Sequence, residues 1–219
     1  MSARPSWTET GRAVAFGLTV RPFFLLRDRL VAPTDPAVRA AMRALRRAPE
    51  PTERFESVLA ARQAALPPEA RTWGETPLSV AHRLLRDAGV GQGSAVVDLG
   101  AGRGAVLLAA RALGAAARGC EIDPARARVI EAPLLACGVK LDVADARTWD
   151  AGAPTHVWLS WITWPATLRA ELSARLASLP SGTRVVALTW APTGPFRVLA
   201  ERRRLFPWGV VDVVSAERE

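Results

Sequence analysis

The 219-residue sequence is short of several residue types that carry common chemistry. It has no tyrosine, and Lys140 is the only lysine among its 29 basic residues. Two cysteines do not make a disulfide framework, so we expect Cys120 and Cys137 to be small buried apolar side chains. The two histidines, His82 and His156, are predicted away from any ligand end of the fold, so we expect both to be structural and expect no histidine base.

Long hydrophobic runs are also absent. No stretch of about 18 residues is both apolar and free of charge, as a membrane-spanning helix requires. The nearest candidate, residues 13–31, is interrupted by arginines, an aspartate and a proline. No small-residue cleavage site follows it, which argues against a signal peptide. We therefore expect a cytoplasmic protein with no membrane insertion.

The net charge is +8, a sign that suits nucleic acid as a partner. The arginines are scattered, however, apart from 46–47 and 202–204, and no known nucleic-acid motif is present. We expect a small-molecule or peptide substrate and no nucleic-acid partner. The sequence leaves a homodimer open.

Residues 95–104, Ala-Val-Val-Asp-Leu-Gly-Ala-Gly-Arg-Gly, carry the strongest local pattern. The apolar start predicts a buried parallel strand that ends near Asp98. Gly100, Gly102 and Gly104 follow, and then an alanine-rich helical stretch. A strand, a glycine turn and a helix N-terminus let backbone approach a ligand closely. The spacing also fits a dinucleotide fingerprint, which leaves a nicotinamide-dependent oxidoreductase as one alternative.

Strand and helix patterns alternate on both sides of this turn. The alternation predicts an α/β fold, a doubly wound Rossmann-like and mostly parallel sheet that binds its ligand at the carboxyl ends of the strands. The expected strands are 95–99, 116–121, 139–143, 155–160 and 184–190, and a closing hairpin pairs 196–203 with 210–215. The expected helices are 77–88, capped by Thr76, then 104–113, 124–137, capped by Asp123 and kinked at Pro133, and 165–179.

The chain divides into two parts in this interpretation. Residues 1–70 form an N-terminal helical extension, with helices over 36–47 and 51–66, that acts as a lid. Residues 71–219 form the ligand-binding domain.

Acidic residues recur where the second and third strands end. Ionised Glu121 accepts hydrogen bonds only, and so suits two ribose hydroxyls. Asp145, with Ala146, is placed to reach an adenine edge, and Asp142 is its rival. Asp98 lies too close to the turn to welcome pyrophosphate, because like charges repel. It suits a cationic ammonium or sulfonium group instead.

This combination resembles the class I S-adenosylmethionine-dependent methyltransferases. Residues 98–104 match their D-x-G-x-G-x-G motif, Glu121 their ribose acid, and Asp145-Ala146 their adenine-side motif. The resemblance spans residues 72–216. It implies a seven-stranded sheet, S-adenosylmethionine as the cofactor, transferase activity and no metal.

A finer resemblance lies ahead of the glycine turn. Trp73-Gly74-Glu75-Thr76 resembles the Tyr-Gly-Glu-Thr loop of the Dot-one type (non-SET) histone-lysine methyltransferases and their bacterial relatives. In that family the loop lies over the methionine end of the cofactor, which implies cofactor contacts from Trp73, Glu75 and Thr76. After the fourth strand that family carries an Asn-Asn-Phe-like segment, whereas this chain has Ser-Trp-Ile-Thr-Trp-Pro over 160–165.

We expect segment 160–165 to meet the methyl acceptor. Trp161 and Trp164 are placed to flank a sulfonium by cation–π contact, and Ser160 or Thr163 to hold a substrate heteroatom. The first hypothesis is methyl transfer to a nucleophilic, nitrogen, atom of a small molecule or peptide. The second is a cyclase in which the amine of S-adenosylmethionine attacks its own methionine chain and releases methylthioadenosine. A non-enzymatic binding module is the third.

Overall fold

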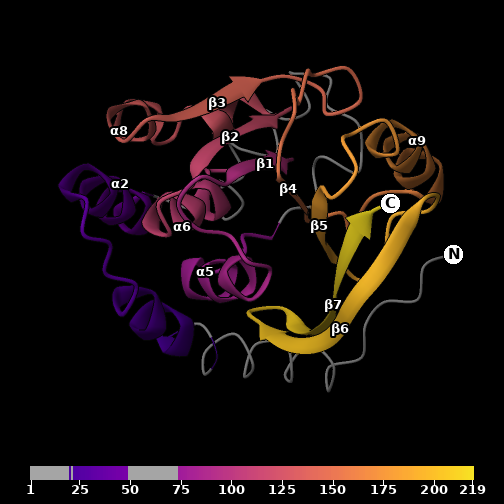
Figure 1. Ribbon diagram of the computed structural model, residues 1–219. Helices are drawn as coiled ribbons and strands as arrows, with labels where there is room; N and C mark the ends of the chain where they lie inside the picture. The colour runs from indigo at the N-terminus through magenta and orange to yellow at the C-terminus, as the bar shows by residue number, and fades with distance from the viewer. Residues whose placement is uncertain (1–19, 21, 49–73) are drawn as a thin grey trace, which may run out of the picture.

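The computed structural model describes residues 20, 22–48 and 74–219 (Figure 1). Its centre is a seven-stranded sheet in the order β3-β2-β1-β4-β5-β7-β6. The strands are β1 (Ala95–Leu99), β2 (Ala116–Glu121), β3 (Val139–Val143), β4 (His156–Leu159), β5 (Arg184–Leu188), β6 (Phe196–Phe206) and β7 (Gly209–Arg218). Strands β1 to β5 are parallel, and β7 is antiparallel to both β5 and β6. The predicted doubly wound sheet and its closing hairpin are confirmed.

Strand β1 lies at the point where the order of the sheet reverses, because the chain adds β2 on one side and β4 on the other. In open α/β sheets, ligands bind at such a switch point, beyond the carboxyl ends of the strands. Asp98 is in register with Gly119 of β2 and Trp158 of β4. A Cβ at Gly119 would lie 2.7 Å from the backbone oxygen of Asp98, so only glycine fits beside that residue.

Helices cover both faces of the sheet, unequally (Figure 1). One face carries α2 (Pro36–Arg47), α5 (Leu78–Asp87), α6 (Ala105–Ala112) and α8 (Glu131–Ala136), which share one hydrophobic cluster with the sheet. The other face carries α9 (Ala166–Leu176), whose Leu172 and Leu176 share a second cluster with Val97, Leu99 and Trp149. Trp149 comes from the loop between β3 and β4, so a loop side chain fills part of this second layer.

Two helix predictions need correction. Thr76 does not cap α5; the N–H groups of Leu78 and Ser79 donate to the carboxylate of Asp28, fifty and fifty-one residues earlier, at 3.2 and 2.8 Å. The predicted helix 124–137 is two helices, α7 (Pro124–Ala127) and α8. The cap of α7 is as predicted, because Asp123 accepts a hydrogen bond from the Ala125 N–H at 2.8 Å.

The described part of the N-terminal extension packs onto the sheet domain. Residues 22–29 are helical, and α2 follows with Asp35 as its side-chain cap. Val38, Ala41 and Met42 of α2 are buried in the same cluster as α6 and α8. The helix predicted over 51–66 lies outside the described residues, and the function of the extension as a lid stays a prediction.

Candidate functional site

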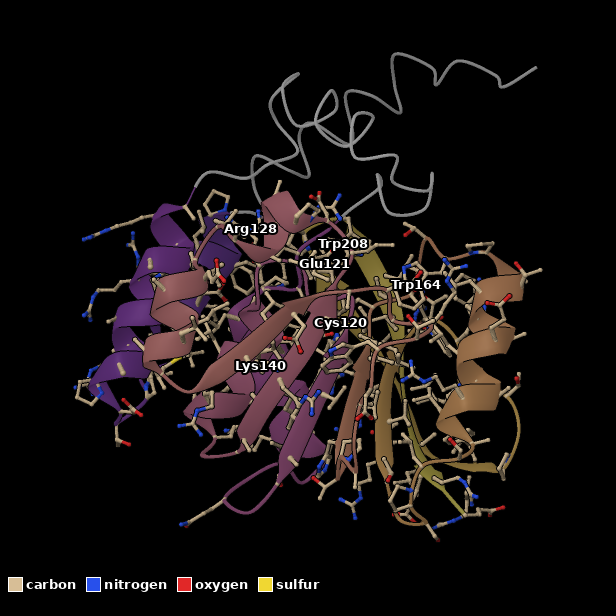
Figure 2. All side chains as sticks on the ribbon, turned by 90° about the horizontal axis from the view of Figure 1, so that it is seen from above. Cys120, Glu121, Arg128, Lys140, Trp164 and Trp208 are labelled. Atoms are coloured by element: carbon tan, nitrogen blue, oxygen red, sulfur yellow. The ribbon has the colours of Figure 1, made fainter. Side chains whose placement is uncertain are left out.

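A cavity of about 390 Å³ lies at the carboxyl ends of β1, β2 and β4, where the sequence places its ligand. Figure 2 shows Glu121, Trp164 and Trp208 gathered at this end of the sheet. The cavity takes side chains from the loop before α5, the glycine turn, the strand ends, α9 and the β6–β7 hairpin. Of the predicted site residues, the following line it: Glu75, Thr76, Asp98, Gly100, Gly102, Glu121, Asp145, Ala146, Ser160, Thr163 and Trp164.

The glycine turn forms one wall of the cavity. Gly100 adopts a φ of 87°, and a Cβ there would lie 3.1 Å from Cζ2 of Trp164. A side chain at this position would therefore be strained and would collide with the indole ring. Gly104, at the N-cap of α6, packs instead against Leu134 of α8 and does not itself line the cavity.

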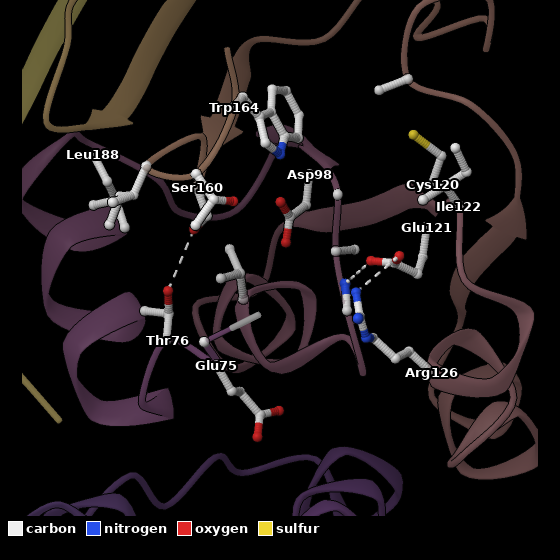
Figure 3. A pocket seen from close by; sticks show the side chains of 18 of the residues that line it. Glu75, Thr76, Asp98, Cys120, Glu121, Ile122, Arg126, Ser160, Trp164 and Leu188 are labelled. Carbon is white, nitrogen blue, oxygen red and sulfur yellow. Dashed lines mark hydrogen bonds and ion pairs between the residues drawn. The ribbon is translucent and has the colours of Figure 1, made fainter. Parts of the chain in front are cut away.

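Asp98 lines the cavity, and one of its carboxylate oxygens has no partner in the part of the chain that the structure describes. Its side chain is 2% exposed, and Oδ1 makes no hydrogen bond with the described residues. Burial, with a smaller contribution from the negative charge of Glu121, raises the pKa of Asp98 well above its usual value. Figure 3 places its carboxylate between Ser160 and Glu121. A buried carboxylate without a partner is costly, and a cationic ligand group in the cavity would supply one.

Glu121 is tied to the glycine turn by its backbone. One carboxylate oxygen accepts a hydrogen bond from the Gly102 N–H at 2.8 Å, and the other accepts from the Asp123 N–H at 2.9 Å. Arg126 lies 3.7 Å from the second oxygen. Burial raises the pKa of Glu121, while these backbone donors and Arg126 act in the opposite direction. The carboxylate is thereby held at the cavity wall with lone pairs left for ligand hydroxyls.

The structure separates the two rival acids of the third strand. Asp145 lines the cavity, whereas Asp142 does not and accepts a hydrogen bond from the indole N–H of Trp149 at 2.9 Å. Asp145 itself is bound by Arg147, whose Nη2 lies 2.6 Å from Oδ2. This hydrogen bond lowers the pKa of Asp145. The Arg147 pairing also occupies lone pairs that an adenine edge would need.

Two hydroxyl groups face each other across the far end of the cavity (Figure 3). Oγ1 of Thr76 lies 3.4 Å from Oγ of Ser160, which joins the loop before α5 to the end of β4. Ser160 also accepts a hydrogen bond from the indole N–H of Trp158 at 2.9 Å. Thr163, three residues on, lines the cavity and is exposed.

Trp161 is not where the sequence analysis placed it. Its side chain is fully buried in the cluster beneath α9, and its indole N–H donates to the backbone oxygen of Trp190 at 3.0 Å. It does not line the cavity. Trp164 does, because the turn after Trp161 brings the second indole back over Gly100.

The loop before α5 is held down on both sides. Glu75 forms an ion pair with Arg103 of the glycine motif, and Arg103 also donates to the backbone oxygen of Ala48 after α2. A Cβ at Gly74 would lie 3.1 Å from the Trp208 ring, so this loop packs directly under the β6–β7 hairpin. Trp73 lies outside the described residues, and its predicted cofactor contact stays a prediction.

Several cavity residues escaped the sequence analysis. Ile122 follows Glu121, and Arg103 lies between two glycines of the predicted turn. Their position next to predicted site residues is the signal that could have identified them. Arg126, Leu168, Leu172, Leu188 and Trp208 also line the cavity. The first four come from helix or strand positions whose sequence pattern indicates only packing, and Trp208 comes from the turn between β6 and β7. The sequence therefore carries no sign of their place in the site.

The remaining candidates for proton or thiol chemistry are one cysteine and the two histidines. Burial raises the pKa of the Cys120 thiol to about 12, so the thiol at this cavity wall stays protonated near neutral pH. His82 and His156 do not line the cavity. Nε2 of His156 lies 3.2 Å from the backbone oxygen of Ala88, and burial lowers the pKa of His156.

No protein-family model and no curated protein sequence matches this chain. Solved structures do. An RNA methyltransferase from Salinibacter ruber in complex with S-adenosyl-L-homocysteine is 26% identical, with a TM-score of 0.54, over 66% of this chain and 94% of that one. TrmN from Thermus thermophilus is 24% identical, with a TM-score of 0.55, over 69% of this chain but only 52% of its own length. A mutant of MtNAS in complex with S-adenosylmethionine is 14% identical with a TM-score of 0.51, over 77% of this chain and 69% of that one.

The chain has the class I methyltransferase fold. The mostly parallel seven-stranded sheet is the one that the resemblance implied. The relation to Dot-one type enzymes is not among these likenesses and remains a sequence resemblance. This is the fold of S-adenosylmethionine-dependent methyltransferases.

Within residues 20, 22–48 and 74–219, no helix combines the length and the apolar character that a membrane crossing requires.

Proposed function

We propose that this methyltransferase binds S-adenosylmethionine in the cavity and transfers its methyl group to a nitrogen atom of a small molecule or peptide. The buried Oδ1 of Asp98, which has no hydrogen-bond partner among the described residues, is the observation that carries the proposal. S-adenosylmethionine is a cation, whereas the dinucleotide alternative would bring pyrophosphate toward this carboxylate. The cavity therefore favours the sulfonium cofactor over a nicotinamide one.

The residues of the cavity fit the parts of that cofactor. Glu121 is placed for the ribose hydroxyls, since its carboxylate is held by two backbone N–H groups and keeps further lone pairs. Ile122, Leu168 and Leu172 give the neighbouring wall an apolar surface that suits the faces of adenine. Asp98 is placed for the cationic groups of the methionine end.

The reaction needs orientation more than acid–base help. When bound, S-adenosylmethionine would supply a methyl carbon that the acceptor lone pair attacks. The carbon–sulfur bond would break with its electron pair remaining on sulfur, and the acceptor nitrogen would lose its proton to water. Trp164 and Trp208 line the cavity with aromatic rings, which reduce the contact of the reacting groups with water. Ser160 and Thr76 supply the polar groups that orient an acceptor nitrogen.

The basic strand β6 does not support a nucleic-acid acceptor. Its arginines are engaged in ion pairs with acids of the same molecule. Arg202 and Arg204 lie 3.0 and 3.9 Å from Asp87. Arg203 lies 3.5 Å from Asp212, and Arg197 lies 2.8 Å from Glu217. Arginines that pair with acids of the same molecule contribute less to phosphate attraction than unpaired arginines do.

Cofactor binding is the first test of the proposal. Calorimetric titration of the protein with S-adenosylmethionine should show binding that Asp98→Asn weakens. Glu201→Ala, an exposed site on β6, is the matched control and should bind as the wild type does. No binding to the wild type or to the control would refute the proposal.

The acceptor is found with S-adenosylmethionine that carries a tritium-labelled methyl group, incubated with an extract of the source organism. We expect the label in the small-molecule or peptide fraction. Label in RNA would refute the proposed acceptor class. This outcome is worth checking because one similar solved structure is an RNA methyltransferase. Methylthioadenosine formed from the cofactor alone, in place of S-adenosylhomocysteine, would establish the cyclase reaction instead.

A further inference from the structure

We propose that Trp158, which does not touch the cavity, positions the Ser160 hydroxyl so that the site selects acceptors that carry an N–H group. This inference rests on the proposed function, because it concerns the acceptor end of the same cavity. It makes Trp158 a positioning residue and Ser160 the group that meets the acceptor.

The first observation is a hydrogen bond whose direction is fixed. An indole N–H only donates, so Ser160 Oγ must accept from Trp158 Nε1 at 2.9 Å. The Trp158 side chain is fully buried in β4, and its register partner on β1 is Asp98. The ring cannot turn away without leaving its own N–H buried and unpaired, which is costly. The indole therefore holds Ser160 in one place.

The second observation limits what Ser160 has left to offer. A serine hydroxyl has one proton and two lone pairs. The indole N–H of Trp158 uses one lone pair. A second hydrogen bond joins Ser160 Oγ to Oγ1 of Thr76, at a distance of 3.4 Å, and Thr76 is 4% exposed. One valence of Ser160 remains for the cavity it lines. Either hydroxyl can be the donor in the contact between Ser160 and Thr76. In the proposed arrangement Ser160 is the donor, which leaves it one lone pair for the cavity.

An acceptor N–H is the group that fits this lone pair. The hydrogen bond to Ser160 then uses the N–H and leaves the nitrogen lone pair free to attack. The opposite arrangement, in which Ser160 donates to the nitrogen, would occupy the attacking lone pair. As positive charge develops on nitrogen, the N–H bond to Ser160 becomes charge-assisted and stronger. An interaction that strengthens in the transition state raises kcat more than it lowers KM.

The direct test is the indole N–H resonance of Trp158, measured by NMR on protein with isotope-labelled tryptophan and assigned by its loss in Trp158→Phe. We expect Ser160→Ala to shift this resonance upfield, and Ser160→Thr, which keeps the hydroxyl, to leave it in place. With S-adenosylhomocysteine bound, aniline should perturb the resonance more than N,N-dimethylaniline does. These two probes are both uncharged near neutral pH and differ in their N–H groups.

The kinetic test uses aniline as the acceptor and follows S-adenosylhomocysteine release. We expect Trp158→Phe to lower kcat by about tenfold, with the KM for S-adenosylmethionine unchanged. Trp149→Phe is the matched control: it removes an indole N–H from a buried ring that bonds Asp142 and does not line the cavity. Thermal melting of both variants checks that they are folded.

The outcomes separate this inference from the proposed function. If S-adenosylmethionine binds but the Trp158 resonance ignores Ser160→Ala, the positioning role is wrong. Equal turnover of aniline and N,N-dimethylaniline, or turnover of neither, would overturn the N–H requirement. Absence of S-adenosylmethionine binding would overturn the proposed function instead.

Discussion

The backbone N–H of Gly102 donates a hydrogen bond to the carboxylate of Glu121 at 2.8 Å. The contact joins the glycine turn after β1 to the acid that ends β2, across nineteen residues of sequence. The position of the glycine turn and the position of the Glu121 carboxylate therefore depend on each other. Disturbing either residue should affect both the stability of the turn and the affinity for the cofactor.

Glu121→Ala should weaken S-adenosylmethionine binding by about ten- to a hundredfold, because a charge-assisted hydrogen bond contributes about 1.5–3 kcal/mol. It should also destabilise the free protein, since the N–H groups of Gly102 and Asp123 lose their acceptor. Titration calorimetry and thermal melting check the two effects. A variant that melts lower but binds normally would show that Glu121 is a structural acid only.

Asp98→Asn should stabilise the free protein while weakening cofactor binding. The pKa of Asp98 is raised by burial, so the folded state opposes ionisation of this carboxyl. Its contribution to stability is fully present below the unfolded pKa of about 4 and is lost as pH rises toward the folded pKa. The melting temperature of Asp98→Asn should thus exceed that of the wild type by a margin that grows with pH above about 4.

The same pKa predicts proton release when the cofactor binds. A cation placed beside Asp98 favours its ionised form, so binding should release protons into the buffer. Calorimetry in buffers of different ionisation enthalpy measures this number. Equal binding enthalpies in all buffers would mean that Asp98 does not change its protonation state when the cofactor binds.

Gly100→Ala should abolish tight cofactor binding, whereas Gly182→Ala should not. Both glycines have strongly positive φ, 87° and 84°, so alanine costs about 1–2 kcal/mol of stability at either site. At Gly100 the new Cβ lies 3.1 Å from the Trp164 ring, whereas no atom of the described residues lies within 4 Å of a Cβ at Gly182. Comparing melting temperatures and dissociation constants separates backbone strain from loss of the cavity wall.

Asp28→Ala should destabilise the start of α5 by about 1 kcal/mol, as loss of a helix cap does. In a chain of this size that corresponds to about 2–4 °C in the melting temperature. Hydrogen exchange should quicken at the N–H groups of Leu78 and Ser79, which Asp28 binds. Asp35→Ala, which uncaps α2 locally, is the control and should leave α5 unchanged.

Much of the fold was determined by local sequence. Alternating strand and helix patterns with glycine and proline boundaries predicted the parallel strands and the hairpin, because each pattern reports which face of an element is buried. The sequence also predicted that Glu121 and Asp98 lie near the glycine turn, since the carboxyl ends of parallel strands meet at one edge of the sheet. Asp123 capped its helix as predicted because that contact spans two residues.

Contacts between distant segments were decided only by the tertiary structure. The α5 cap comes from Asp28, since the packing of the N-terminal segment brings its carboxylate to the start of the helix. Thr76 contacts Ser160 instead. Trp161 is buried, whereas Trp164 lines the cavity. The two residues lie in an irregular turn, whose sequence has no hydrophobic periodicity from which their orientations could be predicted. Sequence sets what a residue can do, and packing decides which partner it meets.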